Sequence, residues 1–126
     1  MPPVKGRILC VEPVSDICAI IQFMLRDRGY DTDSADTIAE AMAKARSGDY
    51  CLYIVDDGYQ DGSNGELIKR LREVAPLAPI IVFSAHAYQS DRQQAMEAGA
   101  SVFLVKPTDI IELTQTVTSL LRPASA

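Results

Sequence analysis

Four short runs of apolar residues divide the chain, and each run is continuous rather than alternating with polar positions. A continuous run is typical of a parallel strand that helices cover on both faces. The runs therefore predict strands at residues 8–11, 52–55, 79–84 and 102–105. A fifth segment, residues 30–35, lies where another strand is needed but has little apolar content, as expected at the edge of a sheet.

Between these runs, apolar residues recur every three or four positions, which is the spacing of an amphipathic helix. Two capping patterns mark helix starts: Thr37 followed by Glu40, and Ser90 followed by Gln93. Glycine and proline residues mark the ends. The predicted helices lie between residues 17 and 29, 37 and 48, 67 and 76, 90 and 99, and 110 and 121.

Strands and helices thus alternate along the chain, joined by short loops. This order predicts an α/β fold, a doubly wound five-stranded parallel sheet with helices on both faces and right-handed crossovers. A chain of 126 residues, 48% of them hydrophobic, can bury one core but is too short for two ordinary domains. We expect a single domain over residues 1–126, with its core at about 6–121 and a polar tail at 122–126.

Charge and composition exclude several classes of function. The net charge of -5 and the pI near 4.7 argue against a basic face for nucleic acid and against binding to an anionic membrane. No run approaches the roughly 18 apolar residues of a membrane span, and the first residues lack the apolar stretch of a signal peptide. We therefore expect a cytoplasmic domain whose partners are proteins or small ions.

Polar side chains follow the ends of the predicted strands. In an open parallel sheet, ligands bind at the carboxyl ends of the strands, where the strand order reverses. Crowded carboxylates suit Mg²⁺, and a hydroxyl beside an ammonium suits the oxygens of a phosphoryl group. The residues at these ends are Glu12, Asp56, Asp57, Ser84 and Lys106, the last followed by Pro107.

The order and spacing of these pieces resemble the receiver domains of two-component response regulators. The resemblance covers nearly the whole chain, from RILCVE through GY, YIVD, GEL, PIIVFSA and AGA to FLVKP. It implies a flavodoxin-like sheet with strand order 2-1-3-4-5. It also implies an aspartate that accepts a phosphoryl group from a histidine kinase or a phosphotransfer protein. The output implied is a change on the surface of the fourth helix, fifth strand and fifth helix, where an unknown downstream protein or a second copy would bind.

The resemblance implies roles for single residues. Ser84 and Phe103 stand at the two switch positions, and Lys106 at the position that binds the phosphoryl oxygens. The peptide bond between Lys106 and Pro107 is expected to be cis, because the family has a tight turn there. Such a domain is not an enzyme acting on other molecules, since it promotes only its own phosphorylation and dephosphorylation.

The implied metal ligands are the carboxylates of Glu12 and Asp56 and the backbone carbonyl of Gly58. The family pattern has an acidic pair after the first strand, whereas here Glu12 is followed by Pro13. Proline supplies no side-chain oxygen, so we expect Mg²⁺ to bind weakly. The expected loss of affinity is on the order of tenfold relative to a Pro13→Asp variant, or about 1.4 kcal/mol.

Two adjacent aspartates compete for the acceptor position. The family's Glu-Leu pair stands ten and eleven residues after the acceptor, so counting back from GEL at residues 65–67 gives Asp56. Reading Asn64-Gly65 as the family's Asp-Gly pair would instead give Asp57. We favour Asp56, because the YIVD pattern before it agrees, and we expect Asp57 to point away as a solvated or loop-capping charge.

Two other functions are compatible with the sequence. Pro13 in place of an acid would fit a degenerate receiver that acts as a phosphorylation-independent interaction module. The run DDGYQDG at residues 56–62 suggests an aspartate-nucleophile phosphatase, although that class places its motif after the first strand and requires an acid at position 58, which is Gly here. A stable mass gain after incubation with a small phosphodonor would favour the receiver over both.

Overall fold

The computed structural model describes residues 6–12, 16–85, 88–106 and 108–121. Within them, strands and helices alternate as predicted. The strands are β1 (Arg7–Val11), β2 (Asp31–Ala35), β3 (Leu52–Val55), β4 (Ile80–Ser84) and β5 (Val102–Val105). The helices are α1 (Asp16–Asp27), α2 (Ile38–Ser47), α3 (Asn64–Val74), α4 (Gln89–Ala98) and α5 (Ile110–Leu121).

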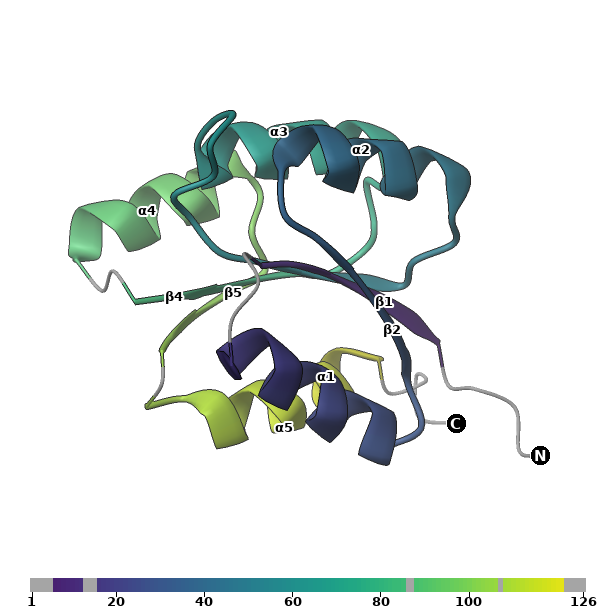
Figure 1. Cartoon of the computed structure of the whole chain (residues 1–126). Coiled ribbons are helices and arrows are strands. Elements are labelled where there is room, and N and C mark those ends of the chain that lie inside the picture. The colour runs from purple at the N-terminus through teal and green to yellow at the C-terminus, as the bar shows by residue number, and fades with distance from the viewer. Residues whose placement is uncertain (1–5, 13–15, 86–87, 107, 122–126) are drawn as a thin grey trace.

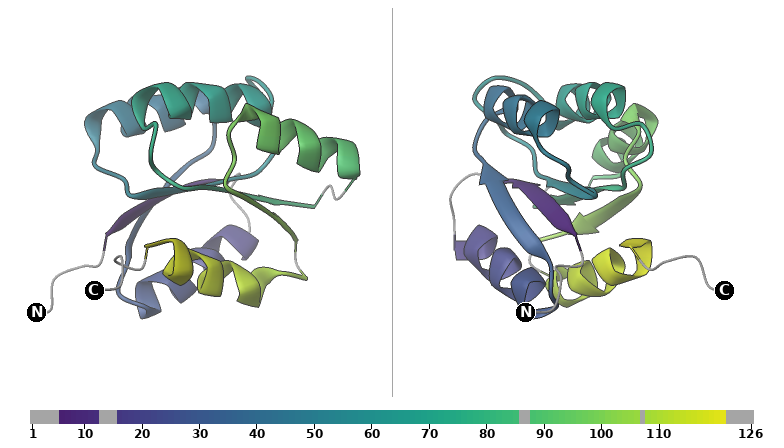
Figure 2. Two further views of the ribbon diagram at one scale, coloured as in Figure 1. Left: turned by 180° about the vertical axis from the view of Figure 1, so that it is seen from behind. Right: turned by 90° about the vertical axis from the view of Figure 1, so that its right-hand side faces the viewer.

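The five strands form one parallel sheet in the order β2-β1-β3-β4-β5. Helices α1 and α5 cover one face, and α2, α3 and α4 cover the other, which gives three layers (Figure 1). The same layers are visible from behind and from the side in Figure 2. The predicted α/β fold and its flavodoxin-like strand order are confirmed. The order reverses between β1 and β3, so the carboxyl ends of these two strands flank the expected ligand position.

The sheet separates two apolar clusters, one under each layer of helices. Side chains alternate along β1, so Ile8 and Cys10 join the cluster with α1 and α5, while Leu9 and Val11 join the cluster with α2 and α3. All four are fully buried. Burial on both faces is the reason that this strand is a continuous apolar run, since each such side chain contributes about 1.5–3 kcal/mol when removed from water.

Strand β2 lies at the edge of the sheet, as its polar sequence predicted. Of its five residues only Ala35 is buried. Asp33 accepts hydrogen bonds from the Lys44 ammonium at 3.2 Å and from the Tyr50 hydroxyl at 2.8 Å. Arg7 on β1 lies 3.6 Å from Asp31 and 3.8 Å from Asp33. We call the group formed by Arg7, Asp33, Lys44 and Tyr50 the edge cluster.

Two helix starts differ in how well the sequence predicted them. Thr37 caps α2 as expected, with its hydroxyl accepting a hydrogen bond from the Glu40 backbone N–H at 3.1 Å. The prediction that Ser90 opens α4 is wrong. The helix begins at Gln89 after Tyr88, which makes no side-chain capping bond, and Ser90 lies inside the first turn. Within the described residues, no helix has both the length and the apolar character needed to cross a membrane.

Candidate functional site

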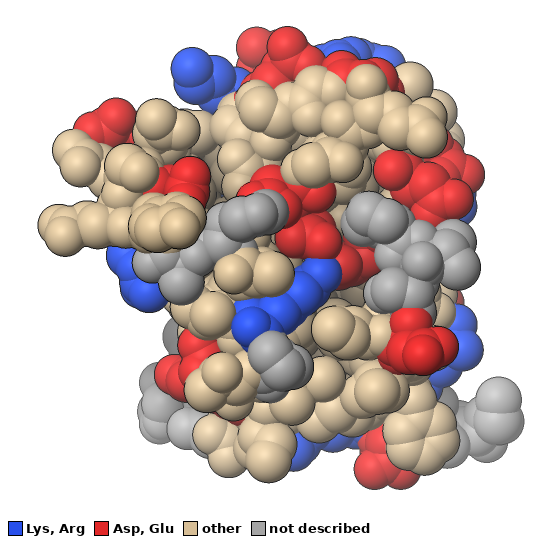
Figure 3. Space-filling model, turned by 60° about the vertical axis from the view of Figure 1, so that its left-hand side comes forward, with Lys and Arg blue, Asp and Glu red and all other residues tan. Residues whose placement is uncertain are grey.

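The side chains that follow β1, β3 and β5 meet at one point of the sheet. Val11 pairs with Val55, so the next residues, Glu12 and Asp56, leave the sheet side by side. The Lys106 ammonium donates to Glu12 Oε2 at 2.7 Å and to Asp56 Oδ2 at 2.6 Å. Figure 3 brings the left-hand side of Figure 1 forward and shows basic side chains next to acidic ones near the middle of that face. We call Glu12, Asp56 and Lys106 the Lys106 cluster.

Burial controls the charges of the Lys106 cluster. Glu12 is fully buried, and this burial, followed by the nearby Asp56 carboxylate, raises the pKa of Glu12 to about 8 despite the opposing ammonium. Burial alone would lower the pKa of Lys106, but its hydrogen bonds with Asp56 and Glu12 outweigh that effect and raise it. The lysine therefore stays charged at neutral pH, and Glu12 retains a proton over much of the neutral range.

Tyr59 ties the ends of β1 and β3 together beneath this cluster. Its hydroxyl donates to the Val11 carbonyl at 2.6 Å and accepts from the Asp56 backbone N–H at 2.7 Å. The ring is buried in the core, and burial raises the pKa of the hydroxyl. Sequence reasoning missed this residue, although an aromatic residue three positions after Asp56 in a polar loop was the available signal.

Asp61 anchors the same loop to α2. Its carboxylate accepts hydrogen bonds from the backbone N–H groups of Ile38 and Ala39, both at 2.9 Å. These two bonds lower the pKa of Asp61, although the side chain is exposed. The first turn of α2 is thus capped both by Thr37 and by a residue from the loop that follows β3.

The structure corrects the expectation for Asp57. Its side chain does not point away from the site: Ser84 Oγ, at the end of β4, donates a hydrogen bond to Asp57 Oδ2 at 3.0 Å. Both residues line a cavity of about 200 Å³, together with Phe103 and Asp91. We call it the switch cavity, because two of its walls are the expected switch residues. Asp57 lies beyond Val55, the last paired residue of β3, so the alternation of side chains along a strand does not set its direction.

The ends of β4 and β5 are held by backbone bonds. The Lys106 backbone N–H donates to the Ser84 carbonyl at 2.9 Å, and the Asp109 carboxylate accepts from the Val105 N–H, also at 2.9 Å. Phe103 is buried, with the Arg92 guanidinium 5.0 Å from its ring centre. Pro107 lies outside the described residues, so the cis peptide bond stays a prediction.

The expected Mg²⁺ ligands are three protein groups, so an ion bound here would keep much of its water. Glu12 Oε1 is buried without a hydrogen-bond partner, which leaves one oxygen available to an ion. Gly58 adopts φ +73, a conformation that favours glycine. Against this, Lys106 already bridges both carboxylates, and the described part of the chain contains no group of three or more acidic, histidine or cysteine side chains placed to hold a metal. Pro13 lies outside the described residues.

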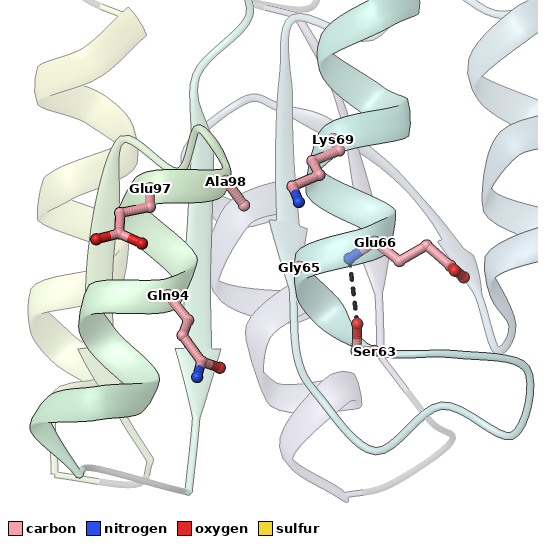
Figure 4. A pocket seen from close by; sticks show the side chains of 7 residues that line it. All are labelled: Ser63, Gly65, Glu66, Lys69, Gln94, Glu97 and Ala98. Carbon is pink, nitrogen blue, oxygen red and sulfur yellow. Dashed lines mark hydrogen bonds between the residues drawn. The ribbon is translucent and has the colours of Figure 1, made fainter.

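A larger cavity lies beside the site, between α3 and α4. It has a volume of about 710 Å³. Polar side chains from both helices line it, among them Glu66, Lys69, Gln94 and Glu97 (Figure 4). Ser63, which also lines the switch cavity, caps α3 at one end by accepting from the Glu66 N–H at 3.2 Å. The start of α3 therefore borders both cavities.

Comparison with curated proteins identifies relatives over nearly the whole chain. Identity to the KDP operon transcriptional regulatory protein KdpE of Escherichia coli is 34% over 120 residues, which covers 95% of this chain and 53% of that protein. Identity to the transcriptional regulatory protein ResD of Bacillus subtilis is 32% over 122 residues, covering 96% and 50%. The chain thus spans about half the length of these curated relatives.

Solved structures agree with this result. A two-component response regulator from Clostridium difficile has a TM-score of 0.89 and 26% identity, covering 96% of this chain and 99% of that one. The receiver domain of the sensor histidine kinase PA1611 from Pseudomonas aeruginosa, described with a magnesium ion coordinated in its active site cleft, has a TM-score of 0.83 and 26% identity, covering 94% and 98%. The family model of the response regulator receiver domain matches residues 8–118. On fold, site geometry and sequence together, this chain belongs to the response regulator receiver domain family.

Proposed function

We propose that this receiver domain accepts a phosphoryl group on Asp56 from the phosphohistidine of a histidine kinase or a phosphotransfer protein. The observation that supports this most directly is the 2.6 Å contact between Asp56 and the Lys106 ammonium, whose side chain is only 10% exposed. Asp57, the competing candidate, accepts a hydrogen bond from the Ser84 hydroxyl at 3.0 Å. The donor protein and the domain would meet in the cytoplasm, and no direct contact with nucleic acid is part of the proposal.

The chemistry requires only a nucleophile and positive charge. An Asp56 carboxylate oxygen attacks phosphorus, the bond from phosphorus to the donor nitrogen breaks, and the leaving imidazole keeps that electron pair. The Lys106 ammonium offsets the negative charge on the transferred oxygens. Mg²⁺, held by Glu12, Asp56 and the Gly58 carbonyl, would add positive charge at the same oxygens. Hydrolysis of the acyl phosphate later returns Asp56, so the domain acts on itself alone.

The proposed output is a population shift at the surface of α4, β5 and α5. Ser84 and Phe103 line one cavity, so a hydroxyl that turns toward new phosphoryl oxygens would change the space available to the aromatic ring. Such a local change shifts the balance between two arrangements of the neighbouring surface. A downstream protein or a second copy of the domain that prefers one arrangement would read the signal there.

Intact mass after incubation with phosphoramidate and Mg²⁺ tests the proposal. We expect the mass gain of one phosphoryl group, lost under conditions that hydrolyse an acyl phosphate. Asp56→Asn should abolish the gain, and Asp57→Asn should retain it. The reverse pattern would show that the acceptor has been placed one residue too early. No gain in the wild type would instead favour the degenerate, phosphorylation-independent module.

Weak Mg²⁺ binding forms part of this proposal. The carboxylates of Glu12 and Asp56 both already bind the Lys106 ammonium. Mg²⁺ binds most tightly when carboxylate oxygens coordinate it directly, so this competition lowers its affinity. Titration calorimetry of the wild type and of Pro13→Asp should show tighter binding in the variant by on the order of tenfold. Equal affinities would show that position 13 does not influence the metal.

A further inference from the structure

Ser84 is engaged before any phosphoryl group arrives. Its hydroxyl donates to Asp57 Oδ2 at 3.0 Å. A serine hydroxyl has a single proton to donate, so it cannot make this bond and a bond to a phosphoryl oxygen at the same time. The partner is a carboxylate, and hydrogen bonds to charged acceptors are about twice as strong as those between neutral groups.

The backbone of Ser84 is held by hydrogen bonds, so only its side chain can turn toward a phosphoryl group. The Ser84 carbonyl accepts from the Lys106 N–H at 2.9 Å, and Ser84 pairs with Val105 in the sheet. Because the main chain is fixed on this side, the hydroxyl can reach Asp56 only by rotating about its own side-chain bond. The switch cavity, about 200 Å³, provides room for that rotation.

We propose that Asp57 is a positioning residue that holds the Ser84 hydroxyl in the resting state and so opposes the switch. The inference rests on the proposed function, since it takes Asp56 as the acceptor. Removing the Asp57 carboxylate removes this acceptor, so the Ser84 hydroxyl no longer has to give up the bond to Asp57 when it turns toward a phosphoryl group on Asp56. The carboxylate thereby sets how strongly the domain must be phosphorylated before it changes its surface.

A simpler effect of Asp57 must be separated from this one. Its negative charge also lies beside the incoming phosphoryl group and would repel it with or without Ser84. Asp91 provides a matched control, because it lines the same cavity as Asp57 and Ser84. A second separation comes from the Ser84→Ala background, in which no hydroxyl remains for Asp57 to hold and only the repulsion persists.

The test measures binding of beryllium fluoride, a tetrahedral mimic of a phosphoryl group on a carboxylate, by NMR titration at saturating Mg²⁺. We expect Asp57→Asn to tighten binding about threefold and Asp57→Ala about tenfold, with less than a twofold change for Asp91→Asn. In the Ser84→Ala background, Asp57→Ala should change binding less than twofold. An equal gain in both backgrounds would overturn the inference, because it would leave charge repulsion as the cause.

A second measurement needs no phosphoryl mimic. Three-bond couplings report the side-chain rotamer of Ser84, which should be single in the unmodified protein and averaged in Asp57→Ala. An unchanged rotamer in the variant would show that Asp57 does not hold the hydroxyl. If the wild type fails to bind beryllium fluoride at all, the proposed function fails and this inference with it. If the wild type binds and Asp57→Ala does not tighten the affinity, only the role of Asp57 is lost.

Discussion

The Lys106 cluster and the edge cluster contain the same chemical ingredients in different surroundings. Each joins a lysine ammonium to a carboxylate, at 2.6 Å for Asp56 and 3.2 Å for Asp33. The side chains of Lys106 and Asp56 are 10% and 13% exposed, whereas those of Lys44 and Asp33 are 32% and 35% exposed. Water screens the edge cluster, so its ion pair contributes little to stability, while the Lys106 cluster must satisfy its charges internally.

Removal of the lysine from each cluster gives the largest expected difference. Lys106→Met should lower the free energy of unfolding by about 3 kcal/mol, because two carboxylates lose their buried counter-charge, although protonation of Glu12 limits the loss. Lys44→Met should lower it by less than about 1 kcal/mol. Denaturant unfolding measures both, and similar losses would show that burial does not separate the clusters. Phosphorylation on Asp56 should slow at least about a hundredfold in Lys106→Met alone, which corresponds to about 2.7 kcal/mol in the transition state.

The two clusters also differ in the tyrosine hydroxyl that each contains or touches. Tyr59→Phe should destabilise the protein by about 2 kcal/mol, since it leaves both the Val11 carbonyl and the Asp56 N–H without their partner. Tyr50→Phe should cost less than about 1 kcal/mol, because the Asp33 carboxylate keeps Lys44 and its access to water. Thermal unfolding of the two variants in parallel checks the difference. A larger loss in Tyr50→Phe would reverse the comparison.

The smallest expected effect, taken per pH unit, is the dependence of stability on pH. The pKa of Glu12 is raised to about 8 in the folded protein, so the folded state binds more protons than the unfolded state between the ordinary value of 4.5 and 8. Stability should therefore fall as pH rises through this window, by less than about 1.4 kcal/mol per pH unit.

Unfolding of the wild type and Glu12→Gln in metal-free buffer from pH 5 to pH 8 measures this slope. The variant should lose most of it, since a glutamine cannot ionise. A control at the edge cluster, Asp33→Asn, should leave the slope above pH 5 unchanged. Stability that rises with pH in the wild type would show that Lys106 keeps Glu12 ionised.

The sequence was informative where burial leaves one choice. Residues 8–11 of strand β1 have to be apolar because the strand contacts both helical layers, and the sequence shows this as a continuous apolar run. The strand order then placed Glu12, Asp56 and Lys106 together without any knowledge of side-chain contacts. Ser84 and Phe103 likewise lie on the walls of one cavity. Their functional roles remain predictions.

Local sequence rules failed where the chain leaves regular structure. The pattern of Ser90 and Gln93 fits a capping box, but the extended backbone at Tyr88 allows the helix to begin two residues earlier. The direction of Asp57 depends on how the loop turns after β3, which no periodicity describes. Tyr59 was missed because its partners are backbone groups of Val11 and Asp56, and backbone groups have no signature in the sequence.

The two hydrogen bonds that Asp61 accepts from the start of α2 allow motion of the loop after β3 to be measured at α2. The hydrogen bonds to the Asp61 carboxylate protect the amide protons of Ile38 and Ala39 from exchange with solvent. Their exchange rates therefore report how often Asp61 moves away, and with it the loop that carries Gly58 and Tyr59. Neither amide belongs to that loop. A ligand that reduces the motion of this loop would lower the exchange rates of both amide protons together. Exchange at the first turn of α2 would then report on motion at the neighbouring site.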